Sequence, residues 1–362
     1  KVLRNNSGKF TDATQELGFA SHQGWWNSVA LGDFDADGRL DIVAGNWGRN
    51  SKYEHTYSKT QPLRMAYADF DKNGVLDIVE YHFDKLTKKM VPERGRSCTM
   101  NAMPTFGTEK ESFESFEAFG KRSLEEVYGK CLEDGTVLPA NTLAHTLFLN
   151  RGGKFEPRRL PAEAQFAPAF GINIADFDGD GHEDIFMAQN FFASQRETPR
   201  SDGGRGLLMR GDGKGGFVPV AGEDSGLKIY GEQRGSAVAD YNHDGRPDLV
   251  VTQNGSHTRL YQNIQARPGR RVKVNGGPAN PTGVGAIVRL KFAEGKMGPA
   301  RLITAGSGYW SQDSAVQVLA TPEPPTHVEI RWPNGETTIT ATPQGTKEIS
   351  IGPGGTLLIP AK

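Results

Sequence analysis

One acidic nine-residue pattern occurs four times in this chain of 362 residues. Its form is Asp-x-(Asp/Asn)-x-(Asp/Asn)-Gly-x-x-Asp, and the copies begin at Asp33, Asp69, Asp176 and Asp240. Alternate side chains of such a turn face one side, and the glycine at position 6 permits the sharp reversal. Carboxylates and a carbonyl gathered there form the all-oxygen cage that calcium takes. The repetition predicts up to four calcium sites.

We expect the side chains at positions 1, 3, 5 and 9 and the backbone carbonyl at position 7 to bind the ion. These positions are Asp33, Asp35, Asp37, Arg39 and Asp41 in the first copy, Asp69, Asp71, Asn73, Val75 and Asp77 in the second, Asp176, Asp178, Asp180, His182 and Asp184 in the third, and Asp240, Asn242, Asp244, Arg246 and Asp248 in the fourth. Repeated sites at equivalent turns favour a role in holding the fold together over a role in sensing calcium. The same regularity argues against glycosidase chemistry for these carboxylates.

Each acidic loop lies between two apolar, alternating segments, such as residues 28–32 and 42–44 around the first copy. This pattern predicts a strand, a loop and a second strand. The second copy also fits the EF-hand expression, with Glu80 at position 12, but no helices flank it and the other copies lack the glutamate. A second repeat, a strand, a glycine turn and a strand, recurs at residues 147–155 and 207–217, opens the chain at residues 3–10, and begins again at 258–263. Together the two repeats predict the four antiparallel strands of a propeller blade.

These repeats resemble the FG-GAP/VCBS blades of integrin α-subunit propellers, and residues 24–53 resemble the large bacterial members of that family. The C-terminal part resembles the ASPIC/UnbV domain that follows such repeats, also seen in cartilage acidic protein, through residues 280–286, 306–312 and 328–335. The resemblances cover nearly the whole chain. They imply a calcium-binding propeller fold more specifically than a function, because one scaffold carries many functions.

We therefore expect an all-β chain with propeller repeats over residues 1–266 and a β-sandwich or small barrel over 267–362. An insertion of about 84–142 is predicted to be partly helical, with helical spacing at 111–120 and 123–128. It holds Cys98 and Cys131, for which an exported protein favours a disulfide over two thiols. Related propellers most often close with seven blades, so N-terminal repeats are expected to be missing. The alternative is a small ring in which the first strands complete the last blade.

Composition agrees with a turn-rich all-β chain. Glycine and proline, 45 and 21 residues, make up about 18% of the chain, against a usual total of about 12%. A net charge of −1 provides no electrostatic footprint for nucleic acid, and no apolar run is long enough to span a membrane. The chain begins at Lys1 without a signal peptide, which indicates a processed or truncated chain. We expect it to be periplasmic, secreted or on the cell surface.

The loop topology also predicts where a partner binds. If the acidic loop joins strands one and two at one face of a blade, the start of strand one and the end of strand two lie at the opposite face. Aromatic, amide and basic residues gather at those positions: Trp25, Trp26, Asn46, Trp47, His82, Asn190, Phe191, Arg234, Asn254 and His257. Such a surface suits a glycan or a protein partner. The alternative is that several of the tryptophans pack inside the propeller.

No catalytic motif accompanies these features: there is no G-x-S-x-G, H-E-x-x-H or Walker sequence. The sequence favours a non-catalytic, calcium-stabilised propeller that binds a glycan or protein, or forms part of a larger surface complex. The alternative is a propeller enzyme acting on polysaccharide. A buried cluster of histidine, carboxylates and arginine in a pocket of the partner face would favour the enzyme.

Overall fold

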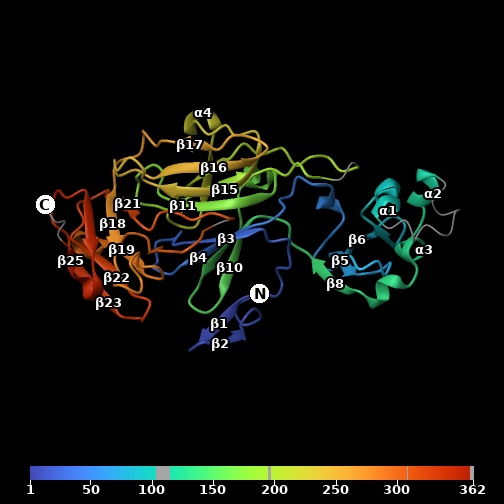
Figure 1. The fold of residues 1–362 in the computed structure, drawn as a ribbon, viewed down its shortest axis with the longest axis horizontal. Coiled ribbons are helices and arrows are strands. Elements are labelled where there is room, and N and C mark those ends of the chain that lie inside the picture. Colours follow the sequence, from blue (N-terminus) through green and yellow to red (C-terminus); the bar gives the residue numbers. More distant parts are fainter. Residues whose placement is uncertain (103–114, 195–196, 308, 359–362) are drawn as a thin grey trace.

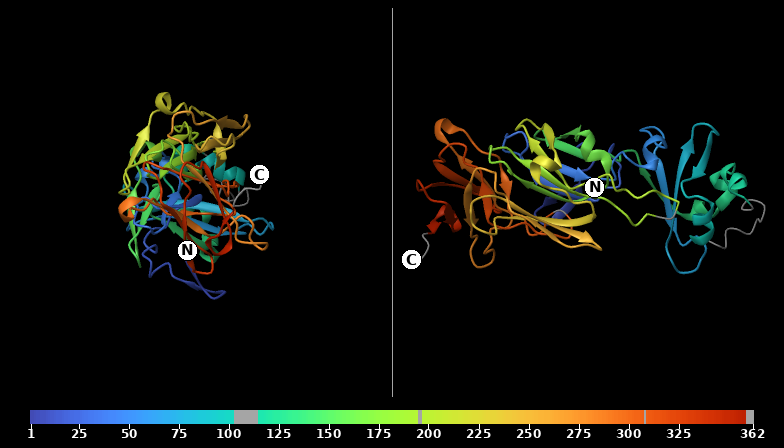
Figure 2. Two further views of the ribbon diagram at one scale, coloured as in Figure 1. Left: turned by 90° about the vertical axis from the view of Figure 1, so that its left-hand side faces the viewer. Right: turned by 90° about the horizontal axis from the view of Figure 1, so that it is seen from above.

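The structure is a computed structural model that describes residues 1–102, 115–194, 197–307 and 309–358. Most of its elements are β-strands in mainly antiparallel sheets, which confirms the all-β class. The molecule is elongated, with the blades between a C-terminal domain on one side and an inserted sheet on the other (Figures 1 and 2).

Three sheets have blade topology. The first is β3 (Ser28–Gly32), β4 (Asp41–Gly45), β9 (Thr146–Asn150) and β10 (Phe155–Arg159); the second is β11 (Ala169–Ala175), β12 (Asp184–Gln189), β13 (Leu207–Gly211) and β14 (Phe217–Val220); the third is β15 (Glu232–Ala239), β16 (Asp248–Asn254) and β17 (Arg259–Tyr261). The inner strand β11 contacts both β3 and β15 and is buried along its whole length. Apolar side chains such as Val43, Ile172 and Met187 fill the core between the first two blades. The blades therefore form an arc with the second blade in its middle.

An inserted sheet interrupts the first blade. Because β9 pairs directly with β4, the whole of residues 46–145 lies between the second and third strands of that blade. The segment forms β5 (Leu63–Ala68), β6 (Asp77–Asp84), β7 (Lys89–Pro92) and β8 (Thr136–Ala140), in the order β7-β6-β5-β8, with the helices α1 (Arg96–Ala102), α2 (Phe116–Gly120) and α3 (Leu124–Tyr128). The insertion is thus longer than the predicted 84–142 and contains the second acidic loop. The short gap between the first two loops follows from this nesting.

The predictions for the insertion concerned its helices and its two cysteines. Helix was expected over 111–120 and 123–128; α2 and α3 agree with it, and residues 111–114 lie outside the described residues. The expected disulfide between Cys98 and Cys131 is absent. Cys131 begins a 3-10 turn, and its Sγ donates a hydrogen bond to the carbonyl of Tyr128 at 2.7 Å. The thiol therefore points back onto its own chain.

The ends of the arc remain open among the described residues. The hairpin of β1 (Leu3–Asn6) and β2 (Lys9–Asp12) pairs only with itself, and β17 pairs only with β16. Within the described residues the hairpin does not pair with the third blade, so strand pairing does not support the small closed ring. Missing N-terminal repeats stay a prediction.

The C-terminal domain consists of two sheets around one core. Its strands are β18 (Arg270–Val274), β19 (Ile287–Lys291), β20 (Arg301–Leu302), β21 (Gln317–Leu319), β22 (His327–Arg331), β23 (Thr337–Ala341), β24 (Glu348–Ile351) and β25 (Leu357–Leu358). The orders are β21-β18-β24-β25 and β20-β19-β22-β23, and Val272, Val288 and Ile330 belong to their shared core. The remaining short helices are η1 (Lys52–His55), η4 (Cys131–Asp134), η5 (Ala162–Phe166), α4 (Gly222–Ser225), η6 (Ala293–Gly295) and η7 (Pro353–Gly355). Among the helices described, none has the length and apolarity to cross a membrane.

Candidate metal loops and ligand surface

The four acidic loops share one backbone conformation. Position 4 is left-handed in each, with φ of 58° at Ala36, 59° at Lys72, 77° at Gly179 and 64° at His243. The glycine at position 6 has φ between 84° and 99°, and its N–H donates to the carboxylate at position 1 at 2.7–3.0 Å in every loop. Only glycine adopts such φ values without strain, which explains its place in the pattern.

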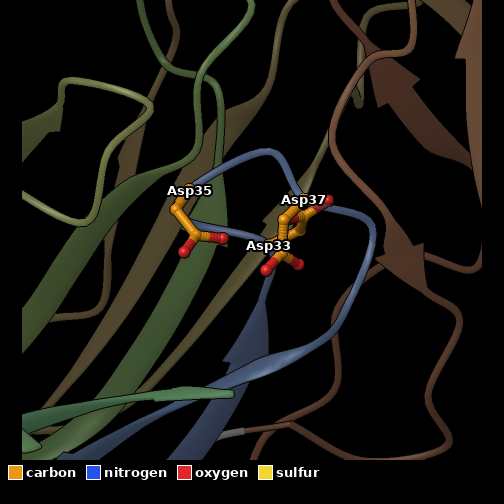
Figure 3. Close-up of side chains that lie close together, drawn as sticks. All are labelled: Asp33, Asp35 and Asp37. Atoms are coloured by element: carbon orange, nitrogen blue, oxygen red, sulfur yellow. The ribbon is translucent and has the colours of Figure 1, made fainter. Parts of the chain in front are cut away.

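Three of these loops gather carboxylate oxygens within 4.8 Å of one another. The groups are Asp33, Asp35 and Asp37; Asp69, Asp71 and Asp77; and Asp176, Asp178 and Asp184. Figure 3 shows the first group around its turn. The Oδ1 atoms of Asp33 and Asp35 are buried without a hydrogen-bond partner. A hard cation satisfies such oxygens, so these residues fit calcium. The carbonyl ligands expected at position 7 stay a prediction.

The electrostatics of the loops favour a cation as well. Burial raises the pKa of Asp33 and Asp41 to about 6, that of Asp176 to about 7 and that of Asp184 to about 8. Neighbouring carboxylates add to this effect, while backbone N–H groups oppose it. Buried negative charge without a compensating partner is costly, and a divalent cation provides that compensation.

The aspartate at position 9 has a second task. In every loop it accepts the N–H of the residue at position 2, at 2.8–3.2 Å. In the three blades its other oxygen accepts a backbone N–H from the third strand or its end, from Asn150 at 2.7 Å, Gly211 at 2.9 Å and Asn263 at 2.7 Å. Asp41, Asp184 and Asp248 therefore tie the loop to the rest of the blade. The sequence predicted them only as ligands.

The C-terminal domain covers the acidic loops of the three blades. The backbone N–H of Ala300 donates to Asp33 Oδ2 at 2.8 Å. Arg301 forms a buried two-pronged pair with Glu183, at position 8 of the third loop. Arg271 Nη1 lies 2.6 Å from Asp240 Oδ2 in the fourth loop. The second loop, in the inserted sheet, has an exposed first aspartate, Asp69.

A row of aromatic rings lies at the opposite ends of the blade strands. Successive ring centroids are 4.9 Å apart for Tyr53–Trp25, 5.9 Å for Trp25–Trp47, 5.1 Å for Trp47–Phe191, 6.2 Å for Phe191–Phe170, 5.2 Å for Phe170–Tyr309 and 5.7 Å for Tyr309–Trp310. We call these seven residues the aromatic row. The Arg234 guanidinium lies over Phe170 at 4.1 Å and over Phe191 at 5.5 Å. The row joins the insertion, the blades and the C-terminal domain.

Tyr309 and Trp310 reach this face on a segment that runs along the inner strands. Asp313 Oδ1 accepts Asn173 Nδ2 at 2.8 Å and the N–H of Val238 at 2.7 Å, and Ser314 N–H donates to the Val238 carbonyl at 2.8 Å. A Cβ on Gly235 would lie 3.1 Å from the carbonyl oxygen of Tyr309, so the segment packs closely on β15. Between it and the strands lies a cavity of about 240 Å³, with Ile174 and Arg301 among its lining residues.

The structure brings together only part of the predicted ligand set. Trp25, Trp47, Phe191 and Arg234 meet in the aromatic row, and Asn254 donates to Glu232, which pairs with Arg234. Trp26 packs against Phe148 instead. His257 is exposed in the loop that follows β16.

Three other residues of the predicted set are engaged elsewhere in the fold. Asn46 and Asn190 are fully buried, and their amides bind backbone: Asn46 donates to the Thr142 carbonyl at 2.8 Å, and Asn190 to the Gly204 carbonyl at 2.9 Å. His82 belongs to β6 of the inserted sheet, where its Nδ1 lies 2.7 Å from Glu93. The sequence patterns did not identify Phe170, Glu232, Tyr309 and Trp310 as members of this surface. Tyr309 and Trp310 nevertheless lie in residues 306–312, which carry the resemblance to the ASPIC/UnbV domain.

Two family models match the chain. Residues 1–44 match an FG-GAP-like repeat, and residues 276–357 match ASPIC and UnbV. No curated protein matches the sequence.

Two solved structures show only weak similarity. An Agrocybe aegerita lectin described as recognising non-reducing terminal N-acetylglucosamine is 14% identical, with 70% of this chain and 84% of the lectin covered and a TM-score of 0.14. The V. cholerae biofilm matrix protein Bap1 is 12% identical, with 84% of this chain and 63% of Bap1 covered and a TM-score of 0.16. Scores this low establish no shared fold. The family models are the informative result: the chain combines an FG-GAP-like repeat at its N-terminus with an ASPIC/UnbV domain at residues 276–357, an architecture typical of extracellular repeat proteins.

Proposed function

We propose that this protein is an exported, non-catalytic scaffold that calcium stabilises and that binds a glycan or a protein partner at the exposed end of the aromatic row, formed by Tyr309 and Trp310. The observation that carries the proposal is the aromatic row, which spans three parts of the molecule. The row ends in Trp310, which is 94% exposed. An almost fully exposed tryptophan costs solubility and contributes nothing to a core. Stacked aromatic rings provide a large contact area at low entropic cost.

Two further features support a binding role for this end of the row. Trp310 has φ of 50°, a left-handed conformation that is strained for a bulky residue. The polar group of Arg234, Glu232 and Asn254 stands beside the rings, linked by contacts of 2.6 Å and 3.1 Å. Aromatic planes with flanking charged and amide groups suit sugar rings and also suit a protein hot spot. Calcium in the loops would hold the blades that position these groups.

The test compares Trp310→Ala with Tyr241→Ala. Tyr241 is half exposed in the fourth acidic loop, at the other end of its blade, and serves as the matched control. Wild type and both variants are assayed on a glycan array and in capture from native envelope extract. We expect Trp310→Ala to weaken binding about tenfold or more and Tyr241→Ala to leave it unchanged. Equal binding by a folded Trp310→Ala protein would rule out this end of the row as the site.

A polysaccharide-acting enzyme is the second candidate, because the inserted sheet contains a cluster of two glutamates with basic side chains. Glu93 is 5% exposed and lies beside His82 and Lys52, while Glu80 accepts the Tyr53 hydroxyl at 3.4 Å and lies 3.9 Å from Arg94. Because basic partners accompany both carboxylates, we assign the cluster a structural role in the inserted sheet. Reducing-end release from polysaccharide that disappears in Glu93→Gln would favour the enzyme instead.

A further inference from the structure

We infer that Arg271 takes the place of a calcium ion in the fourth acidic loop, so that the chain binds calcium in three loops and uses the fourth as a socket for its C-terminal domain. This inference rests on the calcium binding in the proposed function and concerns which loops carry it.

The contacts of Arg271 resemble those of a bound cation. Its Nη1 donates to Asp240 Oδ2 at 2.6 Å and to the Asp240 carbonyl at 3.1 Å, and its Nε donates to Glu348 at 2.7 Å. The side chains of Arg271 and Asp240 are 7% and 1% exposed. The guanidinium thus supplies a positive charge and hydrogen bonds to the buried first carboxylate of the loop. Displacing this buried arginine would break its ion pair with Asp240 and leave the negative charge of that buried carboxylate without a cationic partner.

The other carboxylates of the fourth loop are also engaged. Asp244 pairs with Arg246 at 3.0 Å, as Asp37 pairs with Arg39 in the first loop, and both Asp248 oxygens accept backbone N–H groups, as those of Asp41 and Asp184 do. These two carboxylates therefore do not set the fourth loop apart. Position 3 is Asn242, which brings no charge. The three-carboxylate groups within 4.8 Å occur in the first three loops and not in this one, within the part of the chain that is described.

Arginines near the first and third loops differ in kind. In the first loop the largely buried Arg289 of the C-terminal domain stays 4.0 Å from Asp33 Oδ2, and in the third loop the buried Arg301 binds Glu183 rather than the first carboxylate. Arg151 binds Asp35 at 2.5 Å and Arg210 binds Asp178 at 2.8 Å, but their side chains are 36% and 57% exposed. Exposed pairs are weak, and such side chains move away at little cost. In the first loop two carboxylate oxygens remain buried without a hydrogen-bond partner, and the other three loops contain no such oxygen, so this observation supports a cation in the first loop alone.

The backbone around the fourth loop is consistent with a socket. The N–H of Gly269, just before β18, donates to the Gly245 carbonyl at 2.7 Å. Arg246 Nε donates to the Ala266 carbonyl at 2.7 Å. The fourth loop is therefore bonded to the connection into the C-terminal domain as well as to Arg271 in its first strand, and this docking needs no metal.

The test counts calcium ions bound to the full chain, by calorimetric titration and by metal analysis after equilibrium dialysis. We expect three per wild-type chain. Asp37→Asn and Asp244→Asn form a matched pair, since each residue stands at position 5 and pairs with the arginine at position 7. Asp37→Asn should lower the count to two or weaken one site at least tenfold, and Asp244→Asn should leave three.

A count of four that Asp244→Asn lowers to three would overturn the inference and leave calcium binding itself intact. A count of zero would overturn both. Arg271→Met adds a direct check, because removing the guanidinium should open the loop to a fourth, weaker ion. A folded Arg271→Met protein that still binds three ions would overturn the role of Arg271. If this variant does not fold, the calcium counts of Asp37→Asn and Asp244→Asn still test the inference.

Discussion

Residue type alone does not determine what an aspartate of these loops does. In the three blades position 1 is buried and bound by loop N–H groups, and position 9 ties the loop to its blade. Position 5 is partly solvated and pairs with arginine in the first and fourth loops. The pattern predicted the loop conformation, because glycine at position 6 admits few alternatives. It did not predict these separate tasks, which depend on partners outside the pattern, such as Asn150, 109 residues along the chain, for Asp41.

The buried aspartates make calcium binding depend on pH. Burial raises the folded pKa of Asp176 to about 7 and of Asp184 to about 8, above an unfolded value of about 3.9. Protonation of these groups therefore stabilises the calcium-free fold at low pH, and this contribution is lost as pH rises through about 8. Calcium must displace the same protons.

We expect affinity at the third loop to fall roughly tenfold or more between pH 8 and pH 6. The calcium-induced rise in Tm should be larger at pH 8 for the same reason. Differential scanning calorimetry at both pH values, with calcium and with chelator, measures this rise in Tm. An equal shift at both pH values would contradict the coupling between protons and calcium.

At the scale of the element, local sequence patterns predicted the strands and hairpins correctly, but they did not predict which distant strands pair. Alternation and turn glycines identified the strand-loop-strand units and the hairpins at 147–155 and 207–217. They could not show that β4 pairs with β9 across residues 46–145, because the units around the first and second loops look alike in sequence. The buried amides of Asn46 and Asn190 were misread for a similar reason, since only the fold shows that their partners are backbone groups.

The bond between loop and third strand leads to a prediction for the first blade. Asp41 is fully buried and accepts the N–H groups of Phe34 and Asn150, at 3.0 Å and 2.7 Å. Asp41→Ala leaves the buried N–H of Phe34 and the part-buried N–H of Asn150 without partners, at a cost of about 2–4 kcal/mol. Chemical denaturation should show this loss with calcium and with chelator alike. Asp37→Asn is the control and should lose stability only when calcium is present; a calcium-dependent loss in Asp41→Ala would mean that Asp41 acts mainly as a ligand.

At the scale of the whole molecule, the C-terminal domain reaches both ends of the blades. Its arginines bind the acidic loops, while its residues 309–316 pass along the inner strands and place Tyr309 and Trp310 at the aromatic row. The sequence predicted the domain and the partner face separately. The link between them depends on side chains from distant parts of the chain, which no local pattern encodes.

The inserted sheet has a core of its own, with Val79 and Tyr128 among its members, separate from the core between the blades. The ends of the insertion are adjacent, since Gly48 N–H donates to the Leu143 carbonyl at 2.8 Å. Replacing residues 50–141 by a short glycine-serine turn should therefore leave the blades and the C-terminal domain folded. One calcium ion should be lost with the second loop, because Asp69, Asp71 and Asp77 are removed.

This deletion should also lower the Tm by several degrees, roughly 2–4 °C for each kcal/mol lost. The reason is that Trp25 and Trp47 pack against a small core that includes Tyr53 and Leu63 of the insertion, and both rings become exposed. Circular dichroism, thermal melts and calcium counting on the deleted chain measure the outcome. A deleted chain that fails to fold in saturating calcium would mean that the insertion is required for the first blade to form.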